Sequence, residues 1–411
     1  MAQLLPLASL LLGVAFLLLG SGLLGTLLAV RGGIVGFDCQ TLGIIGSMYF
    51  VGFLAGTYLG PMMLRRVGHV RAFAFFTVAI ACATLLHELV ASAWVWSLLR
   101  LITGMAMVGL YTTIESWLNS HAAPEQRSRI FASYMAVNLG SLALAQQLLH
   151  WSDPGQHVLF SVAALCICAA VMPVAATRLA QPHVEDVHSI GLKTLYDRAP
   201  VACAAALLSG FSQGAFWGLG AVWAHTIELG TSGVAWFMTM AIVGGALFQW
   251  PIGQLTNHLD RGHVISVVAL AAALLSGGLL FATDYGLGAV LVVTLLYGGF
   301  AFALYPLAVA RMMDRLDRRE IISGCGSLLL LHGIGAAIGP IIAGSLMLHV
   351  GPPSLPAWFA GIEILLAAVA WQLSRRAPAD IAHQTNFTPM MRTSPSAIEI
   401  LDPEHEAGAA R

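Results

Sequence analysis

The stretch Gly60-Pro-Met-Met-Leu-Arg-Arg-Val-Gly-His-Val-Arg71 is a short basic segment that joins two long apolar runs. A second basic segment, Gly253-Gln-Leu-Thr-Asn-His-Leu-Asp-Arg-Gly-His-Val264, repeats part of it further along the chain. The shared tripeptide Gly-His-Val starts at Gly68 and again at Gly262, 194 residues later in a chain of 411. A repeat at nearly half the chain length predicts two copies of one architecture.

The composition indicates an integral membrane protein. The chain is 58% hydrophobic and 9% charged, whereas about 25% of the residues of an ordinary soluble domain are charged. Apolar segments of about 20 residues recur, and each is long enough to cross about 30 Å of hydrocarbon. The first apolar run, 4–30, is too long for the core of a cleaved signal peptide, so we expect it to remain as a helix.

Charges, prolines and glycine clusters divide the apolar part of the chain into twelve predicted transmembrane helices. Their approximate limits are 5–30, 42–63, 71–90, 95–118, 130–149, 157–177, 201–226, 233–255, 264–283, 288–311, 323–348 and 356–374. The predicted fold class is therefore an all-α membrane protein with two pseudo-symmetric six-helix halves. We expect a first bundle over 1–177, a cytoplasmic linker over 178–199, a second bundle over 200–376 and a cytoplasmic, disordered tail over 377–411.

The positions of Lys and Arg predict the orientation of the chain in the membrane. With the N-terminus in the cytoplasm, 17 of the 19 Lys and Arg residues fall in cytoplasmic segments, as the positive-inside rule requires. The two exceptions are Arg31, in an outer joint, and Arg100, inside a predicted helix. We expect a multi-pass membrane protein with both termini in the cytoplasm.

Several motifs resemble those of the major facilitator superfamily, and the resemblance extends from residue 1 to about 376. Members usually carry Gly-x-x-x-Asp-Arg-x-Gly-Arg-Arg between helices 2 and 3. Here Arg66 and Gly68 match the Arg and the second Gly, but Arg65 occupies the Asp position. Arg100-Leu-Ile-Thr-Gly104 is similar to the helix-4 motif of the family, and Gly335-Ala-Ala-Ile-Gly-Pro340 is similar to its glycine–proline motif.

Two further segments narrow the resemblance to a bacterial branch of this superfamily whose substrates are unassigned. These segments are the loop 66–73 and Glu115-Ser-Trp-Leu-Asn119. The resemblance implies two halves that expose a central site to the two sides of the membrane in turn, with helices 1, 4, 7 and 10 lining it. Because Asn138-Leu-Gly-Ser141 in helix 5 lacks the proline of the exporter motif, the family pattern does not favour a drug exporter.

Helix 4 carries the most informative face. Arg100, Gly104, Met107, Tyr111 and Glu115 are spaced 4, 3, 4 and 4 residues apart, so they share one side of a helix. Arg100 and Glu115 lie about 22 Å apart along the helix axis and cannot pair directly. The matching positions of helix 10 keep the glycine and the tyrosine but neither ionisable group: Thr294, Gly298, Ala301, Tyr305 and Val309. Charge in one half alone predicts a charged-solute or proton site there.

Each of these two charges has a structural alternative. Arg100 lies six residues after Trp94, which marks the outer interface, so its head group could reach that interface. Glu115 lies near the inner end of the helix and could pair with Arg127 or Arg129 instead of carrying a proton. We predict that Arg100 contacts an anion or a charged partner in the cavity and that Glu115 is a candidate proton carrier or gate residue.

Other polar and aromatic side chains are candidates for the cavity. Arg31 ends helix 1 and is either an anion-attracting group at the outer mouth or a solvated loop arginine. Its counterpart in the repeat, His225, is a second proton-coupling candidate, because histidine changes charge near physiological pH. Buried amides can instead hold helices together through hydrogen bonds. The remaining candidates are Asn138, Gln146 or Gln147, Gln213, Trp217, Gln249, His332 and the paired Tyr111 and Tyr305. Glu363 on helix 12 is a further polar residue, and the resemblance implies a peripheral position for it.

The two basic segments are predicted to form a cytoplasmic gate. The predicted gate residues are Gly60, Arg65, Arg66, Gly68, Arg71, Gly253, Asp260 and Arg261. The Asp of the family motif sits near a helix N-terminus, where negative charge is favoured, and an arginine cannot take that role. We expect Arg65 and Arg66 to bind acidic residues of the facing inner loop or of helix 4, namely Asp314, Asp317, Glu320 or Glu115.

The sequence shows no enzyme active-site pattern. It lacks the glycine-rich loop followed by Lys-Ser or Lys-Thr that binds ATP phosphates, so a proton is the expected coupling ion. Its six cysteines lack metal-site spacing, and we expect no metal or other cofactor. Basic clusters occur only in inner segments, where topology explains them, so no nucleic-acid partner is expected.

We predict a monomeric secondary transporter of a small-molecule solute, surrounded by membrane lipid. The alternatives are uniport without a coupling ion, a membrane sensor that kept the fold without transporting, and an intramembrane enzyme.

Overall fold

The computed structural model describes residues 4–121, 126–176, 190–256, 259–317 and 320–376, which form helices and short connections without a strand. The helices of the first half are α1 (Leu4–Val35), α2 (Cys39–Val67), α3 (His69–Leu89), α4 (Ala93–His121), α5 (Arg127–Gln147), η2 (Leu148–Trp151), α6 (Val158–Ala169) and α7 (Val171–Ala175). Those of the second half are α8 (Leu192–Arg198), α9 (Pro200–Thr226), α10 (Gly230–Leu255), α11 (Arg261–Ala282), η3 (Thr283–Tyr285), α12 (Leu287–Ala301), α13 (Leu304–Met313), α14 (Ile321–Val350) and α15 (Ser354–Arg376). The predicted all-α class is confirmed.

The structure accounts for the twelve predicted spans with one qualification. Within the described residues, eleven helical stretches are long and apolar enough to cross a membrane. The remaining predicted span corresponds to α5, which is more polar because it contains Arg129, Asn138 and two glutamines. Because α5 packs between α1 of its own half and α10 of the other half, part of its polar surface is covered by protein.

The tenth predicted span, 288–311, is confirmed as one apolar stretch over Leu287–Met313. A short turn interrupts it, because α12 ends at Ala301 and α13 begins at Leu304. Pro306 explains the break, because proline has no N–H and its ring clashes with the carbonyl group four residues earlier, which belongs to Phe302. At the break the amide of Ala303 donates to the carbonyl of Phe300 at 3.3 Å, and regular bonding resumes when Leu307 donates to Ala303 at 3.0 Å.

The predicted linker is partly helical. Helix α8 covers its last part, and Arg198 at the end of α8 forms an ion pair with Glu320, which precedes α14. Residues 178–189 of the predicted linker and the predicted tail 377–411 lie outside the described residues.

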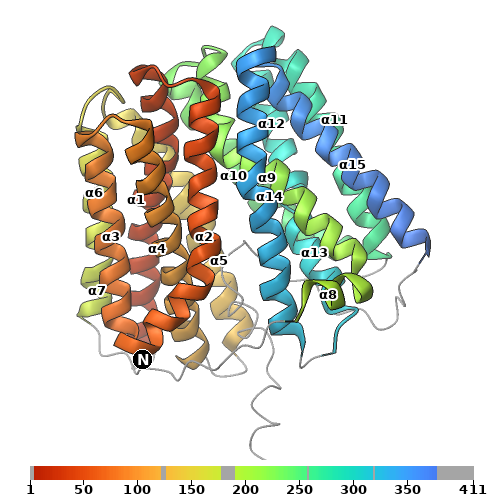
Figure 1. The fold of residues 1–411 in the computed structure, drawn as a ribbon, viewed down its shortest axis with the longest axis horizontal. Helices are drawn as coiled ribbons and strands as arrows, with labels where there is room; N and C mark the ends of the chain where they lie inside the picture. The colour runs from red at the N-terminus through yellow and green to blue at the C-terminus, as the bar shows by residue number, and fades with distance from the viewer. Residues whose placement is uncertain (1–3, 122–125, 177–189, 257–258, 318–319, 377–411) are drawn as a thin grey trace, which may run out of the picture.

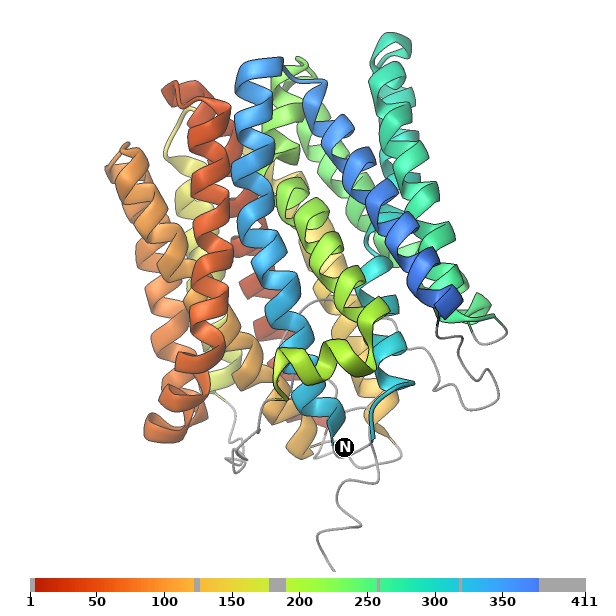
Figure 2. The same cartoon turned by 45° about the vertical axis from the view of Figure 1, so that its right-hand side comes forward.

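The two halves stand side by side. In Figures 1 and 2 the red-to-yellow helices of the first half lie beside the green-to-blue helices of the second. Contacts between the halves join α2 to α14 and α9, α1 to α9, and α5 to α10. The central part of the molecule is therefore lined by helices of both halves.

The internal repeat has a structural counterpart in two glycines. A Cβ atom on Gly104 of α4 would collide with the carbonyl of Tyr49 on α2, and a Cβ on Gly298 of α12 would collide with the carbonyl of Ala241 on α10. Each half thus packs its second and fourth spans through a glycine at the same position of the repeat. Small residues allow such close approach of helices in membranes.

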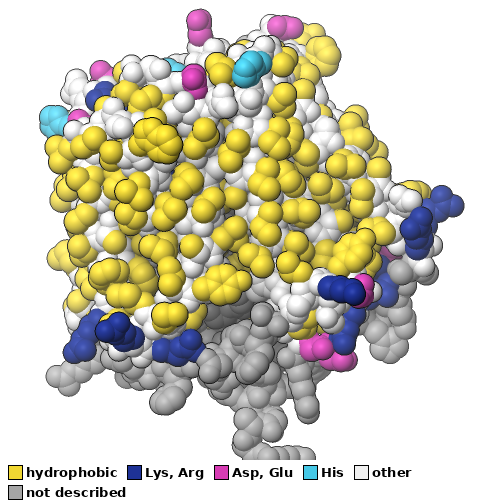
Figure 3. Space-filling view, viewed as in Figure 1, with side chains coloured by type: hydrophobic (Ala, Val, Ile, Leu, Met, Phe, Trp, Pro, Cys, Tyr) yellow, Lys and Arg dark blue, Asp and Glu magenta, His cyan; other side chains and the backbone are white. Residues whose placement is uncertain are grey.

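The outer surface matches a protein that crosses a membrane. Figure 3 shows apolar side chains over the middle of the visible face, with charged side chains gathered towards its two ends. One end, here named the arginine-rich face, carries the exposed Arg65, Arg66, Arg71, Arg198 and Arg375. The other end is here named the opposite face.

The two halves pack most closely near the opposite face. A Cβ on Gly344 of α14 would lie 2.5 Å from the carbonyl oxygen of Cys39 at the start of α2. A Cβ on Gly43 of α2 would collide with the backbone of α14, and a Cβ on Gly46 would lie 3.0 Å from the Cα atom of Gly218 on α9. At this end the backbones of the two halves are therefore almost in contact.

Candidate functional site

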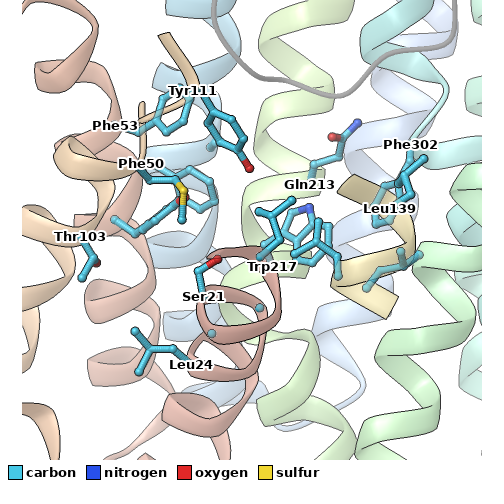
Figure 4. Close-up of a pocket in the computed structure, with 18 of the residues that line it drawn as sticks. Ser21, Leu24, Phe50, Phe53, Thr103, Tyr111, Leu139, Gln213, Trp217 and Phe302 are labelled. Carbon is cyan, nitrogen blue, oxygen red and sulfur yellow. The ribbon is translucent and has the colours of Figure 1, made fainter. Parts of the chain in front are cut away.

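A cavity lies between the two halves, where the middle sections of their helices face one another. The centre of a water molecule can occupy about 170 Å³ of it. Side chains of α1, α4 and α9 and of the α12–α13 break line it, as expected for spans 1, 4, 7 and 10, and α2, α5, α10 and α14 contribute as well. Figure 4 shows Tyr111 and Phe50 on one side of the cavity and Gln213, Trp217 and Phe302 on the other.

The structure brings together five of the seven residues predicted to line the cavity. They are Arg100, Tyr111, Gln213, Trp217 and Tyr305. The further candidates Gln146, Gln249 and His332 also line it. Arg31 and Asn138 are not among the lining residues. The side chain of each is hydrogen-bonded elsewhere, as described below.

Arg100 is the only Lys or Arg among the lining residues in the described part of the chain. Its guanidinium carbon lies 4.4 Å from the centre of the Tyr49 ring, a cation–π contact. Its side chain faces the cavity rather than the membrane interface near Trp94, which was the structural alternative. Among the ion pairs of the described residues, none includes Arg100.

The walls of the cavity are largely aromatic. The rings of Trp217 and Phe302 are stacked, with centroids 5.6 Å apart and an interplanar angle of 14°. On the side of α2, Tyr49 and Phe50 make an edge contact at 5.3 Å. Tyr49 and Trp217 both pack against the small cluster that contains Phe50 and Ala336. An aromatic surface thus continues from the first half to the second.

Gln213 holds the broken helix. Its amide nitrogen donates to the carbonyl of Ala301, the last residue of α12, at 3.0 Å. A helix break leaves carbonyl groups without their usual partners, so Gln213 satisfies one of them from α9. Its side chain therefore combines the two roles considered for buried amides, because it lines the cavity and also joins two helices.

On the wall formed by α14, His332 packs against Tyr305, with ring centroids 4.6 Å apart. The Nδ1 atom of His332 lies 3.2 Å from the carbonyl of Ala206 and 3.4 Å from the hydroxyl of Ser209. This nitrogen is therefore directed at α9 within the same half.

Four predicted residues lie away from the cavity. Arg31 donates to the carbonyl of Gly155 in the connection before α6. His225, at the end of α9, lies next to Gly33 of α1. Asn138 is buried and donates to the carbonyl of Tyr134 one turn earlier at 2.8 Å. Glu115 is also fully buried, and it accepts a hydrogen bond from the Tyr134 hydroxyl at 3.1 Å.

The first predicted gate segment is a helix boundary. Gly68 has φ = 80°, ends α2 and precedes α3, and glycine adopts this left-handed conformation at little cost. Gly60 lies against Gly109 of α4, since a Cβ on it would be 3.2 Å from the Gly109 Cα atom. The side chains of Arg65, Arg66 and Arg71 are exposed.

The second predicted gate segment forms a buried charge lattice. Arg261 at the start of α11 binds Asp314 at the end of α13, and Arg311 of α13 binds Asp260 at 2.8 Å. We define the charge lattice as these four residues. Asp314 and Glu320, two expected partners of the basic loop at 65–66, are thus bound by Arg261 and Arg198 respectively. Gly253 is buried near the end of α10, and its carbonyl accepts the Thr256 hydroxyl at 2.7 Å.

Sequence comparison agrees with this geometry. The sequence profile described as Major Facilitator Superfamily matches residues 202–400. A curated relative from Salmonella typhimurium (strain LT2), described as the uncharacterized MFS-type transporter YcaD, is 24% identical over 381 residues, which cover 92% of this chain and 98% of the relative. The resemblance to the major facilitator superfamily is confirmed.

Solved structures of the superfamily share the fold. A crystal structure of the nucleoside transporter NupG superposes with a TM-score of 0.74 at 15% identity, covering 92% of this chain and 100% of that chain. A crystal structure of the E. coli fucose:proton symporter FucP superposes with a TM-score of 0.57 at 14% identity, covering 92% and 99%. At these identities the likeness concerns the fold, and together with the sequence matches it supports a membrane transporter.

One further polar residue, Glu363, was expected to be peripheral because it lies on the last span. Glu363 of α15 is fully buried but does not line the cavity. Its Oε1 atom accepts hydrogen bonds from Ser212 of α9 at 2.9 Å and from Tyr297 of α12 at 3.1 Å. These partners are distant in sequence and follow no helical spacing, so no sequence signal could have joined them. The group closes the contact among three helices directly behind the α12–α13 break.

Proposed function

We propose that the protein is a secondary transporter that moves a small solute across the membrane by alternating access. The observation that carries this proposal is the central cavity, which both halves line. Among the described residues that line it, one arginine lies with aromatic and amide side chains. Substrate sites of this transporter class lie near the midplane between two repeats, and discontinuous helices commonly form them. The α12–α13 break beside Gln213 fits that pattern.

The contacts between the halves support the alternating motion. Near the opposite face, α2 and α14 meet through Gly344 and Gly43. Gln147 of α5 also donates to the Thr239 hydroxyl of α10 at 2.6 Å. At Gly43 and Gly344 backbone atoms make the contact and no side chain of either glycine interlocks across it, so the two bundles can separate at these positions.

Proton coupling is part of the proposal. Glu115 is a fully buried carboxyl group in the first half, bound to the Tyr134 hydroxyl, and ionisable groups inside transmembrane segments commonly serve proton transfer. One structural neighbour, FucP, is a fucose:proton symporter and so uses the coupling ion proposed here. We also place the protein in the inner membrane with the arginine-rich face in the cytoplasm, because the positive-inside rule favours that orientation.

The test is solute counterflow in proteoliposomes. Candidate solutes are nucleosides, sugars, amino acids and organic acids, each with and without a pH gradient. Transport predicts counterflow of at least one class, which Arg100→Gln in the cavity should abolish and Arg375→Gln at the exposed end of α15 should leave unchanged. Binding of a solute without counterflow would favour the sensor alternative.

The proton arm of the proposal needs a separate variant. Glu115→Gln keeps the size of the side chain and an oxygen that can accept the Tyr134 hydroxyl, but it cannot bind and release a proton. We expect this variant to retain counterflow and to lose accumulation driven by a pH gradient. Gradient-driven accumulation at the wild-type level would remove Glu115 from the coupling mechanism.

A further inference from the structure

We propose that the cavity binds small organic monoanions that carry a planar apolar group, with the carboxylate on Arg100 and the plane against the aromatic wall. This inference rests on the proposed function, because it names the solute class that the same cavity would take. Three features of the cavity carry it, and they concern its charge, the free donors of Arg100 and the shape of its walls.

The first feature is the charge of the cavity. Within the described part of the chain, Arg100 is the only Lys or Arg that lines it, and no Asp or Glu lines it. The other ionisable lining residue of consequence is His332, whose Nδ1 atom is directed at α9. The cavity therefore favours a solute with one negative charge and disfavours a cation, which would meet Arg100 without a compensating carboxylate.

The second feature is the guanidinium of Arg100. It lies over the Tyr49 ring at 4.4 Å, and none of the ion pairs among the described residues includes it. A cation–π contact uses the face of the guanidinium, whereas its five N–H donors lie in the plane. The donors are thus left for an acceptor in the cavity, and the fork of an arginine matches both oxygens of a carboxylate.

The third feature is the shape of the aromatic wall. Tyr49, under Arg100, packs against Phe50, and Trp217 packs on the same cluster. Trp217 in turn is stacked on Phe302. A flat ring attached to a carboxylate can therefore lie along this wall while its charged end stays on Arg100. Planar groups gain from such offset stacking beyond the burial of their area.

Competing solute classes fit less well. A sugar or a free nucleoside needs several hydrogen-bonding groups, but two of the amides in the cavity are already bonded. Gln213 donates to Ala301 at 3.0 Å, and Gln146 accepts from Thr26 while it donates to Leu142. A simple inorganic anion would use Arg100 but leave the aromatic wall uncovered.

The experiment is a binding measurement on purified full-length protein in lipid nanodiscs, without any gradient. The aromatic carboxylates are phenylacetate, 3-phenylpropionate and indole-3-acetate. The matched probes are 2-phenylacetamide, which lacks the charge, phenethylamine, which reverses it, and acetate, which lacks the ring. Isothermal titration gives the dissociation constants, and thermal unfolding gives an independent signal, since a ligand of the native state raises the melting temperature.

We expect at least one aromatic carboxylate to bind at least about tenfold more tightly than the amide, the amine and acetate, because a charge-assisted pair is lost in each control or the ring is absent. Arg100→Gln should weaken that binding by at least about tenfold. Arg100→Lys, which keeps the charge but not the fork, should give an intermediate affinity, and Arg375→Gln should bind like the wild type. Arg100→Lys keeps the test decisive if Arg100→Gln fails to fold.

Three results would overturn the assignment. The first is that none of the three aromatic carboxylates binds. The second is that the amide or the amine binds as tightly as its carboxylate. The third is that both Arg100 variants bind the carboxylate as tightly as the wild type does. Failure of the proposed function looks different, since a carboxylate that binds through Arg100 but shows no counterflow refutes transport and leaves this inference intact.

Discussion

The close contact between Gly344 and Cys39 predicts how the opposite face is kept closed. Gly344→Ala adds one methyl group to α14 at a position where it would lie 2.5 Å from the Cys39 carbonyl oxygen on α2. An ordinary van der Waals separation is about 3.5 Å, so the two helices must move apart by roughly 1 Å. The clash lies between the halves, and it therefore penalises the closed arrangement rather than the fold of either half.

The size of the effect follows from the cost of overpacking. Inserting a methyl group into a tightly packed contact costs about 1–3 kcal/mol. Since about 1.4 kcal/mol corresponds to a factor of ten, the ratio of separated to closed molecules should rise by roughly 5- to 150-fold. The substitution also adds a helix-favouring residue to α14, which stabilises both arrangements equally by about 1 kcal/mol at most and so leaves their ratio unchanged.

Cys39 provides the assay. Its thiol is partly buried in the closed arrangement, and it sits at the contact that Gly344→Ala disturbs. In a variant in which the other five cysteines are replaced by alanine, the rate of labelling by a charged maleimide in nanodiscs reports access to this contact. We expect the Gly344→Ala variant to be labelled at least about five times faster, in proportion to the population shift.

Two matched glycines serve as controls. Gly361 on α15 has open space where a Cβ would lie, so Gly361→Ala should leave both labelling and stability near wild type. Gly339 on α14 contacts the carbonyl of Phe211 on α9, within the same half, so Gly339→Ala should lower thermal stability without faster labelling. If Gly344→Ala is labelled at the wild-type rate, or Gly339→Ala is labelled just as fast, the Gly344 contact does not control closure.

Two further predictions concern buried polar groups, both measured by unfolding in mixed detergent. Arg261→Ala should lower the free energy of unfolding by about 3–5 kcal/mol, because it removes the guanidinium that binds the Asp314 carboxylate, which is 4% exposed; equal stability of this variant and the wild type would contradict the charge lattice. Glu363→Gln should stay within about 1 kcal/mol of wild type, because it keeps an acceptor for Ser212 and Tyr297. Glu363→Leu should be less stable than Glu363→Gln by about 1–3 kcal/mol, and the reverse order would refute the hydrogen-bonded arrangement.

The sequence predicted the helices and part of the cavity for clear physical reasons. Apolar runs long enough to cross hydrocarbon leave few alternatives to helices, and the repeat located matching residues such as Tyr111 and Tyr305 on the same side of corresponding spans. Helical spacing alone also aligned Glu115 with Arg100. In the structure, Arg100 and Tyr111 line the cavity, whereas Glu115, one turn further along α4, does not. Spacing defines a face and does not say which neighbour covers each turn of it.

The remaining differences arise from contacts between distant segments. The bond between Ser212 and Glu363 spans 151 residues of sequence, and no periodicity within one helix encodes it. The break before Leu304 is of another kind, because Pro306 was visible and the clash of proline with the carbonyl four residues earlier is a local rule. The apolar run continues through the proline, so hydropathy located the span correctly but did not register the lost hydrogen bond within it.

The break also makes the two halves mechanically unequal. In the first half, α4 is one continuous helix from Ala93 to His121. A displacement of one end of α4 is therefore transmitted to its other end. In the second half, α12 is fastened to α10 at Gly298, while α13 is fastened to α11 by Arg311. Between these two fixed arms the segment at Phe302, which lines the cavity, acts as a joint. A solute bound there contacts the continuous helix α4 on one side and the interrupted pair α12–α13 on the other. The second half can therefore bend at this point, whereas the first half can only tilt as one piece.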